Sequence, residues 1–412
     1  MSAQIIFIVI IAILVFDFIL DNYLDQINLK YKKKALPDEL KGIYTEEEYQ
    51  KSLAYQRANA SFSQITESLS FVVMMGLLIS GSFGKIHDFT GLYISDPIWQ
   101  GIAFFALLTL ASDFLTIPFQ LYSVFVIEEK FGFNKMTYKT FFLDKIKGYL
   151  LGAVLGGLLG YAFFYLVINI GPNFWLYFWG VFFAFSLFMN AFYASLIVPL
   201  FNKLTPLEEG ELRSAIETYC QKVNFPLTNL FVIDGSKRSN KANAFFSGMG
   251  KNKKVVLYDT LIKDHSQEEL VAVLAHEVGH YKKKHIPQSL IISGVQMAVI
   301  LFLLSLFIYN PALSQALGSD KMSIALNLMA FSLMFSPISM IIGLFFNVLS
   351  RKNEFEADKF AKDTYNGEAL ASALKKLSAN NLSNLNPHPL FVFFHYSHPP
   401  LLQRLRALMD AK

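Results

Sequence analysis

Long apolar stretches alternate with short charged segments along this chain. A helix of about 20 apolar residues is long enough to cross the hydrocarbon core of a membrane. By length and apolarity we predict seven spans, at Ala3–Asn22, Thr66–Ser82, Pro97–Phe119, Gly148–Ile170, Phe174–Phe201, Ile286–Tyr309 and Ser323–Leu349. Only Gly171, Pro172 and Asn173 separate the fourth span from the fifth, which predicts a tight turn. The pattern therefore indicates a mainly helical, multi-pass membrane protein.

The composition agrees with this interpretation. Apolar residues make up 53% of the chain, aromatic residues 15% and charged residues 17%. These values are typical of an integral membrane protein that contacts membrane lipid and also has a soluble portion. The net charge of +4 is too small to indicate a nucleic-acid partner. Cys220 is the single cysteine, so an internal disulfide is excluded, and we expect this residue to be buried.

Lysine and arginine residues divide the loops into two groups. The segments after the first and third spans are basic, with Lys30, Lys32, Lys33, Lys34, Lys41, Lys51, Arg57, Lys130, Lys135, Lys139, Lys145 and Lys147. The opposite loops carry Lys85 and Lys321. Because basic loops remain in the cytoplasm, we predict an outer or lumenal N-terminus and a cytoplasmic C-terminus. The compartment would be the inner membrane in a bacterium or the endoplasmic reticulum membrane in a eukaryote. For the oligomeric state, a monomer is the simplest expectation.

The segment between the fifth and sixth spans predicts a small α/β domain. Thr205-Pro206-Leu207-Glu208 is typical of the start of a helix, which would end near Val223. Leu230–Ile233 and Val255–Tyr258 are short apolar runs that indicate strands, and residues 243–246 indicate an edge strand. Both this segment and the one after the seventh span are expected on the cytoplasmic side.

A helix that follows these strands carries candidate metal ligands. Residues 276–280 read His-Glu-Val-Gly-His, an H-E-x-x-H motif, and Ser266 with Glu269 predicts a capped helix start ahead of it. Positions i and i+4 share a helix face, so His276 and His280 can bind one zinc ion. Glu277 occupies the position of the general base in a zinc peptidase.

A catalytic zinc ion usually has a third protein ligand. We propose Glu354, which follows the seventh span and shares a helix face with Asp358, while Glu356 points elsewhere. Asp358 would accept a hydrogen bond from a ligand histidine and fix its tautomer. By itself this stretch is also typical of a charged helix next to a membrane.

Three further residues are candidates for contact with the substrate. His398 could donate to an oxyanion, and Arg404 could bind carbonyl or carboxylate groups. Asn243, on the candidate edge strand, could hold a peptide backbone. Taken alone, a histidine before two prolines is more often structural, and an asparagine is more often a turn former. His285, which follows three lysines, is interpreted as an interfacial residue without a role in the site.

The chain thus divides into four parts: residues 1–201 with five spans, 202–285 with a zincin-like domain, 286–349 with two spans, and 350–412, which completes the zinc site. As a whole it resembles the CAAX prenyl protease type 1 family, the a-factor-converting zinc endopeptidases. The matching segments are His276–His280, Ser350-Arg351 with Asn353–Asp358, Ser397–Leu405, Asn243-Ala244-Phe245, Val126–Lys130 and Gly132–Lys135.

The resemblance implies a barrel of seven helices around a water-filled intramembrane chamber, with one zinc ion at its cytoplasmic end. It implies that His276, His280 and Glu354 bind zinc, that Glu277 is the base, and that His398, Arg404 and Asn243 stabilise the transition state and bind substrate. Eukaryotic members of the family remove the last three residues of prenylated Cys-a-a-X proteins. The expected partners are therefore protein or peptide substrates, with or without a C-terminal prenyl group.

Two alternative functions remain open at the level of sequence. A related heat-shock type endopeptidase, which degrades misfolded membrane proteins, would use the same site without any need for prenylation. Such relatives have fewer spans, but a fold does not determine a substrate. A transporter with a structural zinc ion would need paired polar residues or interrupted helices in matching halves, and the chain has only scattered acids such as Asp17 and Asp113 in its spans.

Overall fold

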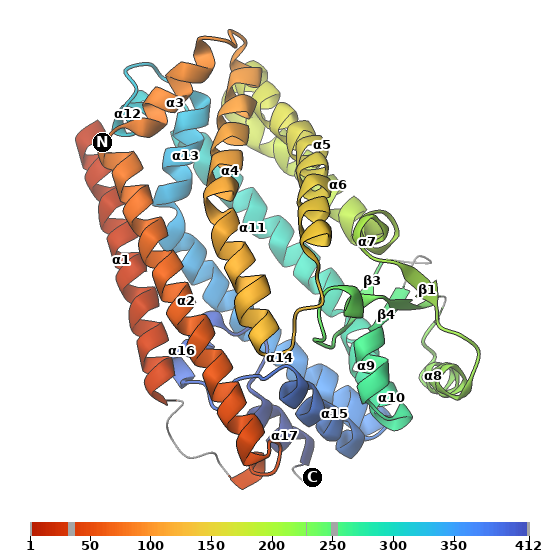
Figure 1. Cartoon of the computed structure of the whole chain (residues 1–412). Helices are drawn as coiled ribbons and strands as arrows, with labels where there is room; N and C mark the ends of the chain where they lie inside the picture. Colours follow the sequence, from red (N-terminus) through yellow and green to blue (C-terminus); the bar gives the residue numbers. More distant parts are fainter. Residues whose placement is uncertain (1, 32–37, 228, 249–253, 410–412) are drawn as a thin grey trace.

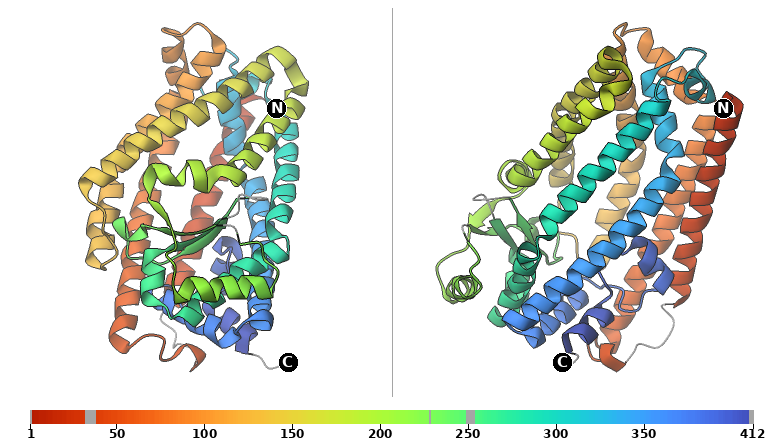
Figure 2. Two further views of the ribbon diagram at one scale, coloured as in Figure 1. Left: turned by 90° about the vertical axis from the view of Figure 1, so that its right-hand side faces the viewer. Right: turned by 180° about the vertical axis from the view of Figure 1, so that it is seen from behind.

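The computed structural model describes residues 2–31, 38–227, 229–248 and 254–409. Lys32, Lys33 and Lys34, which contribute to the predicted topology, lie outside the described residues. Long helices run along most of the molecule, and the two chain ends lie near its opposite ends (Figure 1). A small sheet and several shorter helices lie in the half of the molecule that carries the C-terminus (Figures 1 and 2).

The first group of elements contains the apolar helices and the short helices that connect them. These are α1 (Ala3–Tyr31), α2 (Glu46–Ile79), α3 (Ser82–Gly91), α4 (Pro97–Tyr122), α5 (Tyr138–Ile170), α6 (Phe174–Leu196), α7 (Val198–Phe201), α11 (His285–Phe307), α12 (Pro311–Ala316), α13 (Ile324–Met334) and α14 (Ser336–Thr364). Asp96 caps α4 and Thr45 caps α2, each by accepting hydrogen bonds from backbone N–H groups of the first turn.

The predicted number of seven membrane spans is not confirmed by the count of candidate segments. Five helical segments of the described chain are long and apolar enough to cross a membrane, or six if α13 and α14, which meet at 54°, form one span. One of the five is the 64-residue stretch Tyr138–Phe201. It contains both α5 and α6, which pack against each other and run in opposite directions (Figure 1). The seven-helix barrel therefore stays a prediction.

The small sheet has the strand order β1-β2-β4-β3. Its strands are β1 (Leu204–Pro206), β2 (Leu230–Ile233), β3 (Ala244–Ser247) and β4 (Lys254–Tyr258). β2 and β4 are parallel, and the two outer pairs are antiparallel. The three predicted strands are confirmed, and β3 lies at an edge. The predicted helix start at Thr205 is wrong: residues 204–206 pair with β2, and α8 (Glu211–Lys222) begins later.

The remaining helices are α9 (Asp259–Asp264), α10 (Gln267–Lys282), α15 (Gly367–Asn380), α16 (Pro389–His395) and α17 (Leu401–Met409). Of these, α9 and α10 contact the sheet, α15 packs against α10, and α16 and α17 pack against α14. Their core centres on α10, where Val271, Ala272, Leu274, Ala275 and Val278 are all fully buried. Cys220 is 1% exposed and belongs to the same core, as predicted. A separate core, which includes Ile10, Phe104 and Phe174, joins the apolar helices.

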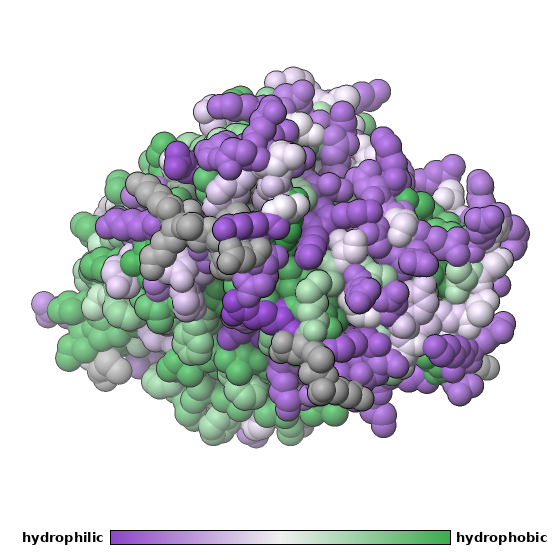
Figure 3. Space-filling view, turned by 90° about the horizontal axis from the view of Figure 1, so that it is seen from below, coloured by the Kyte–Doolittle hydropathy of each residue, from purple (hydrophilic) through white to green (hydrophobic). Residues whose placement is uncertain are grey.

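Polar and apolar surfaces divide the molecule in the way a membrane protein requires. At the end that carries the C-terminus, hydrophilic side chains cover much of the surface, and hydrophobic side chains gather along one side (Figure 3). Two acids within the predicted spans have protein partners: Asp113 pairs with Lys145 at 2.7 Å, and Asp17 accepts a hydrogen bond from Ser336. Such pairing reduces the energetic cost of an acid within a membrane.

Candidate metal centre

The helix α10 begins with a capping box whose glutamate also accepts hydrogen bonds from α15. The Ser266 hydroxyl accepts from the N–H of Glu269, and the Ser266 N–H donates to the Glu269 carboxylate, as predicted. Ser372 and Lys376 of α15 also donate to this carboxylate. Burial by itself opposes ionisation of Glu269, but these donors lower its pKa to about 2. The contacts therefore fix both the start of α10 and its position against α15.

The structure brings the three predicted ligands together. His276 and His280 lie one turn apart on α10, and their Nε2 atoms are 3.1 Å apart. Glu354 comes from α14, with one carboxylate oxygen 3.3 Å from His280 Nε2 and the other 3.5 Å from His276 Nε2. The side chains of His276 and Glu354 are 9% and 5% exposed. One ligand atom from each of the three residues lies within 4.8 Å of the other two.

This geometry fits a tetrahedral metal ion. Zinc bonds of about 2.0–2.1 Å in a tetrahedron place ligand atoms about 3.3 Å apart, close to the separations found here. The Oε2 atom of Glu354 is buried and makes no hydrogen bond of good geometry among the described residues, although His398 Nδ1 lies 3.1 Å from it and Arg404 3.5 Å from it. A buried carboxylate oxygen in this state is costly unless a cation is bound to it. Two ring nitrogens and a carboxylate are also ligands that zinc accepts.

Glu277 lies between the two ligand histidines in sequence and is half-buried. Burial raises its pKa, and the neighbouring His276 and His280 oppose this effect. A carboxylate with a raised pKa is better suited to accept a proton near neutral pH than an ordinary surface glutamate. The structure thus places a candidate base in the environment that this chemistry requires.

Asp358 and Arg404 lie directly behind His276. Asp358, which is 1% exposed, lies 2.9 Å from His276 Nδ1. Arg404 of α17 donates to both oxygens of Asp358, at 2.6 and 2.8 Å, and its side chain is 11% exposed. A bidentate pair of this kind is rigid. Arg404 therefore fixes the carboxylate of Asp358, which in turn contacts His276. The Nη1 atom of Arg404 also lies 3.5 Å from Glu354 Oε2.

His398 lies next to Glu354 in the loop before α17, and Asn243 lies in the loop before β3. His398 Nδ1 is 3.1 Å from Glu354 Oε2, and its side chain is 67% exposed. Asn243 is exposed and immediately precedes the edge strand β3, which packs against α10. Its side-chain oxygen accepts from the N–H of Ala244, and its backbone oxygen accepts from Tyr258. Both side chains are accessible to a substrate, and their predicted roles stay predictions.

His285, interpreted from the sequence as an interfacial residue without a role in the site, is buried next to a candidate ligand. It is 4% exposed, and its Nδ1 lies 3.0 Å from Nδ1 of the ligand His280. Sequence reasoning missed this neighbour because position 285 lies five residues after His280. On one continuous helix that spacing would place the two residues on different faces. The only signal available was the histidine itself, at the border between the motif helix and a span.

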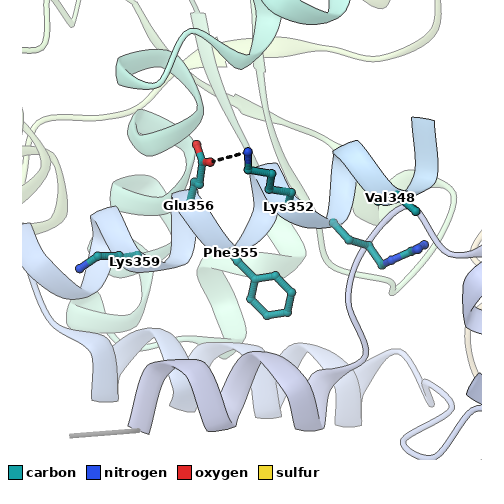
Figure 4. A pocket seen from close by; sticks show the side chains of 6 residues that line it. Val348, Lys352, Phe355, Glu356 and Lys359 are labelled. Atoms are coloured by element: carbon teal, nitrogen blue, oxygen red, sulfur yellow. Dashed lines mark ion pairs between the residues drawn. The ribbon is translucent and has the colours of Figure 1, made fainter. Parts of the chain in front are cut away.

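Two cavities in the described part of the chain lie away from the three candidate metal ligands. One, of about 470 Å³, lies on α14 and is lined by Val348, Arg351, Lys352, Phe355, Glu356 and Lys359 (Figure 4). The other, of about 650 Å³, includes Phe131, Asn240 and Asp259 in its lining. Neither is lined by His276, His280 or Glu354. The assignment of the site therefore depends on its ligand geometry and not on cavity volume.

A His-His-Glu centre on crossing helices of a multi-pass helical protein defines the class of membrane-embedded zinc metallopeptidases. Comparisons with known proteins agree. Residues 26–203 match the model described as "CAAX prenyl protease N-terminal, five membrane helices", and residues 206–412 match "Peptidase family M48". Together these matches cover most of the chain, which belongs to the CAAX prenyl protease 1 family.

Similar proteins occur in distant organisms. A CAAX prenyl protease 1 homolog of Oryza sativa subsp. japonica is 38% identical, over 98% of this chain and 97% of the relative. A homolog of Homo sapiens is 34% identical, over 92% and 89% of the two chains. The crystal structure of S. mikatae Ste24p superposes with a TM-score of 0.94 at 33% identity, covering 98% of this chain and 99% of that one. The chain is therefore an M48 metallopeptidase with the Ste24p-like fold.

Proposed function

We propose that this protein is an endopeptidase that removes C-terminal residues from prenylated Cys-a-a-X proteins and uses one zinc ion held by His276, His280 and Glu354. The observation that carries the proposal is the meeting of these three side chains next to Glu277. The relatives that match nearly the whole chain are named as CAAX prenyl proteases, which supports this substrate class. A quality-control peptidase would share the same centre but would not require a prenyl group.

Each residue at the site has a role in this proposal. Bound zinc would polarise the scissile carbonyl and lower the pKa of the attacking water. Glu277 accepts a proton from that water and delivers it to the leaving amine. His398, exposed and next to Glu354, donates to the oxygen that becomes negative in the transition state.

The remaining residues hold the ligands and the substrate. Asp358 accepts the Nδ1 proton of His276, and Arg404 fixes Asp358 and presents its positive charge towards the site. A substrate in extended conformation would add to the outer edge of β3, where Asn243 can bind its backbone. This arrangement is supported by the edge position of β3 and its contact with α10.

We also propose that the chain crosses the membrane seven times, through α1, α2, α4, α5, α6, α11 and the α13–α14 pair. The helices α5 and α6 contain 33 and 23 residues, so each alone is long enough to cross. An odd number of crossings places the N-terminus and the metal centre on opposite sides. The basic loops then place the metal centre and the C-terminus in the cytoplasm. A water-filled chamber between the helices would admit the substrate.

The proposal is tested with two peptides and the purified protein in detergent. One peptide ends in a farnesylated Cys-a-a-X sequence and the other is identical but unprenylated, with a Glu277→Gln variant to exclude contaminating peptidases. We expect cleavage of the farnesylated peptide before its last three residues and much slower cleavage of the other. Equal cleavage of both would favour a general membrane endopeptidase. Cleavage of neither by zinc-loaded protein would contradict the substrate assignment.

A further inference from the structure

A chain of hydrogen bonds leads from the ligand His280 to the surface of α14. His280 Nδ1 lies 3.0 Å from His285 Nδ1, and His285 Nε2 lies 3.2 Å from a carboxylate oxygen of Glu356. The His285 side chain is 5% exposed, whereas that of Glu356 is 40% exposed. Glu356 lines the surface cavity on α14 and also pairs with Lys352 at 3.9 Å (Figure 4). A buried ligand is thus joined to a solvent-exposed carboxylate.

One arrangement of protons satisfies this chain when His280 binds a metal through Nε2. The Nδ1 atom of His280 then carries a proton and donates it to His285. His285 accepts at Nδ1, so its own proton is on Nε2, where it is donated to Glu356. Every hydrogen bond has one donor and one acceptor, and neither ring has to be charged. These contacts are therefore compatible with a metal bound at His280 Nε2 while both histidine rings stay neutral.

The backbone next to His285 is shaped for this contact. Lys284 has φ 61°, in the left-handed region, between the end of α10 and the start of α11. For a residue other than glycine this conformation is energetically unfavourable. On a continuous helix, position 285 would lie about 140° around the axis from His280. The turn at Lys284 instead brings the first residue of α11 back to the ring of His280, and strain of this kind is common at functional sites.

We propose that His285 and Glu356 are positioning residues that hold His280 in the tautomer and orientation that bind zinc. The inference rests on the zinc centre proposed above. His276 has a different support, the fully buried Asp358. Each ligand histidine is therefore held separately, and the loss of His285 should loosen the metal while the contact between Asp358 and Arg404 stays intact.

The test measures how fast zinc leaves the full-length protein in detergent when a chelator is added in excess. Loss of an outer hydrogen-bond partner typically weakens metal binding about 10–100-fold, so we expect His285→Leu to lose zinc faster by a factor in this range. In His285→Asn, the side-chain oxygen can take the place of Nδ1 as acceptor, and most of the retention should return. Glu356→Ala should show a smaller increase, because His285 can still accept from His280.

His265 provides a matched control. It is also buried, and within the described part of the chain its ring nitrogens contact the backbone oxygens of Leu261 and Ala373. His265→Leu should lower the midpoint of thermal unfolding without faster loss of zinc from the folded protein.

Three results would overturn the inference: unchanged zinc loss in His285→Leu, equal loss in the leucine and asparagine variants, or equal loss in His265→Leu. A wild-type protein that binds no zinc would instead overturn the metal centre itself, and this inference with it.

Discussion

Gly279 packs so closely against Ala357 that a Cβ atom on the glycine would lie 3.0 Å from the Cα atom of the alanine. The same atom would lie 3.1 Å from the carbonyl oxygen of Ala357. Both neighbouring atoms belong to the backbone of α14, so they cannot move aside as a flexible side chain can. The glycine in the middle of the motif therefore permits the close crossing of α10 and α14, and this crossing places Glu354 opposite His276 and His280.

Replacement of Gly279 by valine should separate the two helices and weaken the metal centre. We expect a zinc content well below one ion per chain and a loss of stability of about 1–3 kcal/mol, the usual cost of overpacking a core. Metal analysis and thermal unfolding of the purified variant measure both effects. Gly343→Val is the matched control, because a Cβ atom at this position of α14 meets open space. Full zinc content in Gly279→Val would show that the close crossing is unnecessary.

Replacement of Glu277 by glutamine should reduce peptide hydrolysis without loss of bound zinc. The amide has nearly the same shape but cannot accept the proton of the attacking water, so activity should fall by about 10²–10⁴-fold or more. Zinc content should stay at the wild-type level, because Glu277 is not one of the three ligands. Turnover of a cleavable peptide and metal analysis of the same sample check both expectations. Near-normal turnover would remove Glu277 from the role of general base.

Replacement of Glu354 by alanine should remove zinc as well as activity. This variant removes one of three ligands and leaves two histidines, too few for a stable zinc site of the usual kind. We expect most of the zinc to be lost on dialysis against a weak chelator, together with activity. The measurement is zinc per chain, compared with Glu277→Gln prepared in parallel. Wild-type zinc content after dialysis would contradict the ligand role.

The buried carboxylate of Glu269 should make the soluble part sensitive to acid. Its pKa in the folded protein is about 2, below the ordinary 4.5. The contribution of this group to stability is therefore fully present above about pH 4.5 and is lost as the pH falls from 4.5 towards 2. One pKa unit corresponds to about 1.4 kcal/mol, and Lys376 is partly exposed, so we expect a contribution of about 1–3 kcal/mol.

Thermal unfolding of the wild type and of Glu269→Gln at several pH values tests this expectation. The variant should be less stable at pH 7, and the difference between the two proteins should shrink below pH 4.5. A difference that stays constant down to pH 3 would show that Glu269 is not the group responsible.

The local pattern of the sequence was sufficient for several parts of this protein. The Ser266–Glu269 capping box, the strands at residues 230–233 and 255–258, and the edge strand near Asn243 depend on contacts between residues close in the chain or on simple alternation. The placement of Glu354 and Asp358 on one face also follows from helical spacing alone. These features were predictable because short-range geometry leaves few alternatives.

Other features depended on partners that are distant in the chain. Thr205 was expected to cap a helix, but residues 204–206 gain more by pairing with β2, and this displaces the start of α8 to Glu211. His285 reaches His280 only because Lys284 adopts a left-handed conformation, and Arg404 meets Asp358 only after α17 packs beside α14. The sequence by itself thus predicted the candidate metal ligands, the candidate base and most of the elements. Tertiary structure decided that Arg404 supports Asp358 and that His285 contacts His280, because hydrogen bonds between side chains from distant segments require a proximity in space that spacing along the chain does not encode.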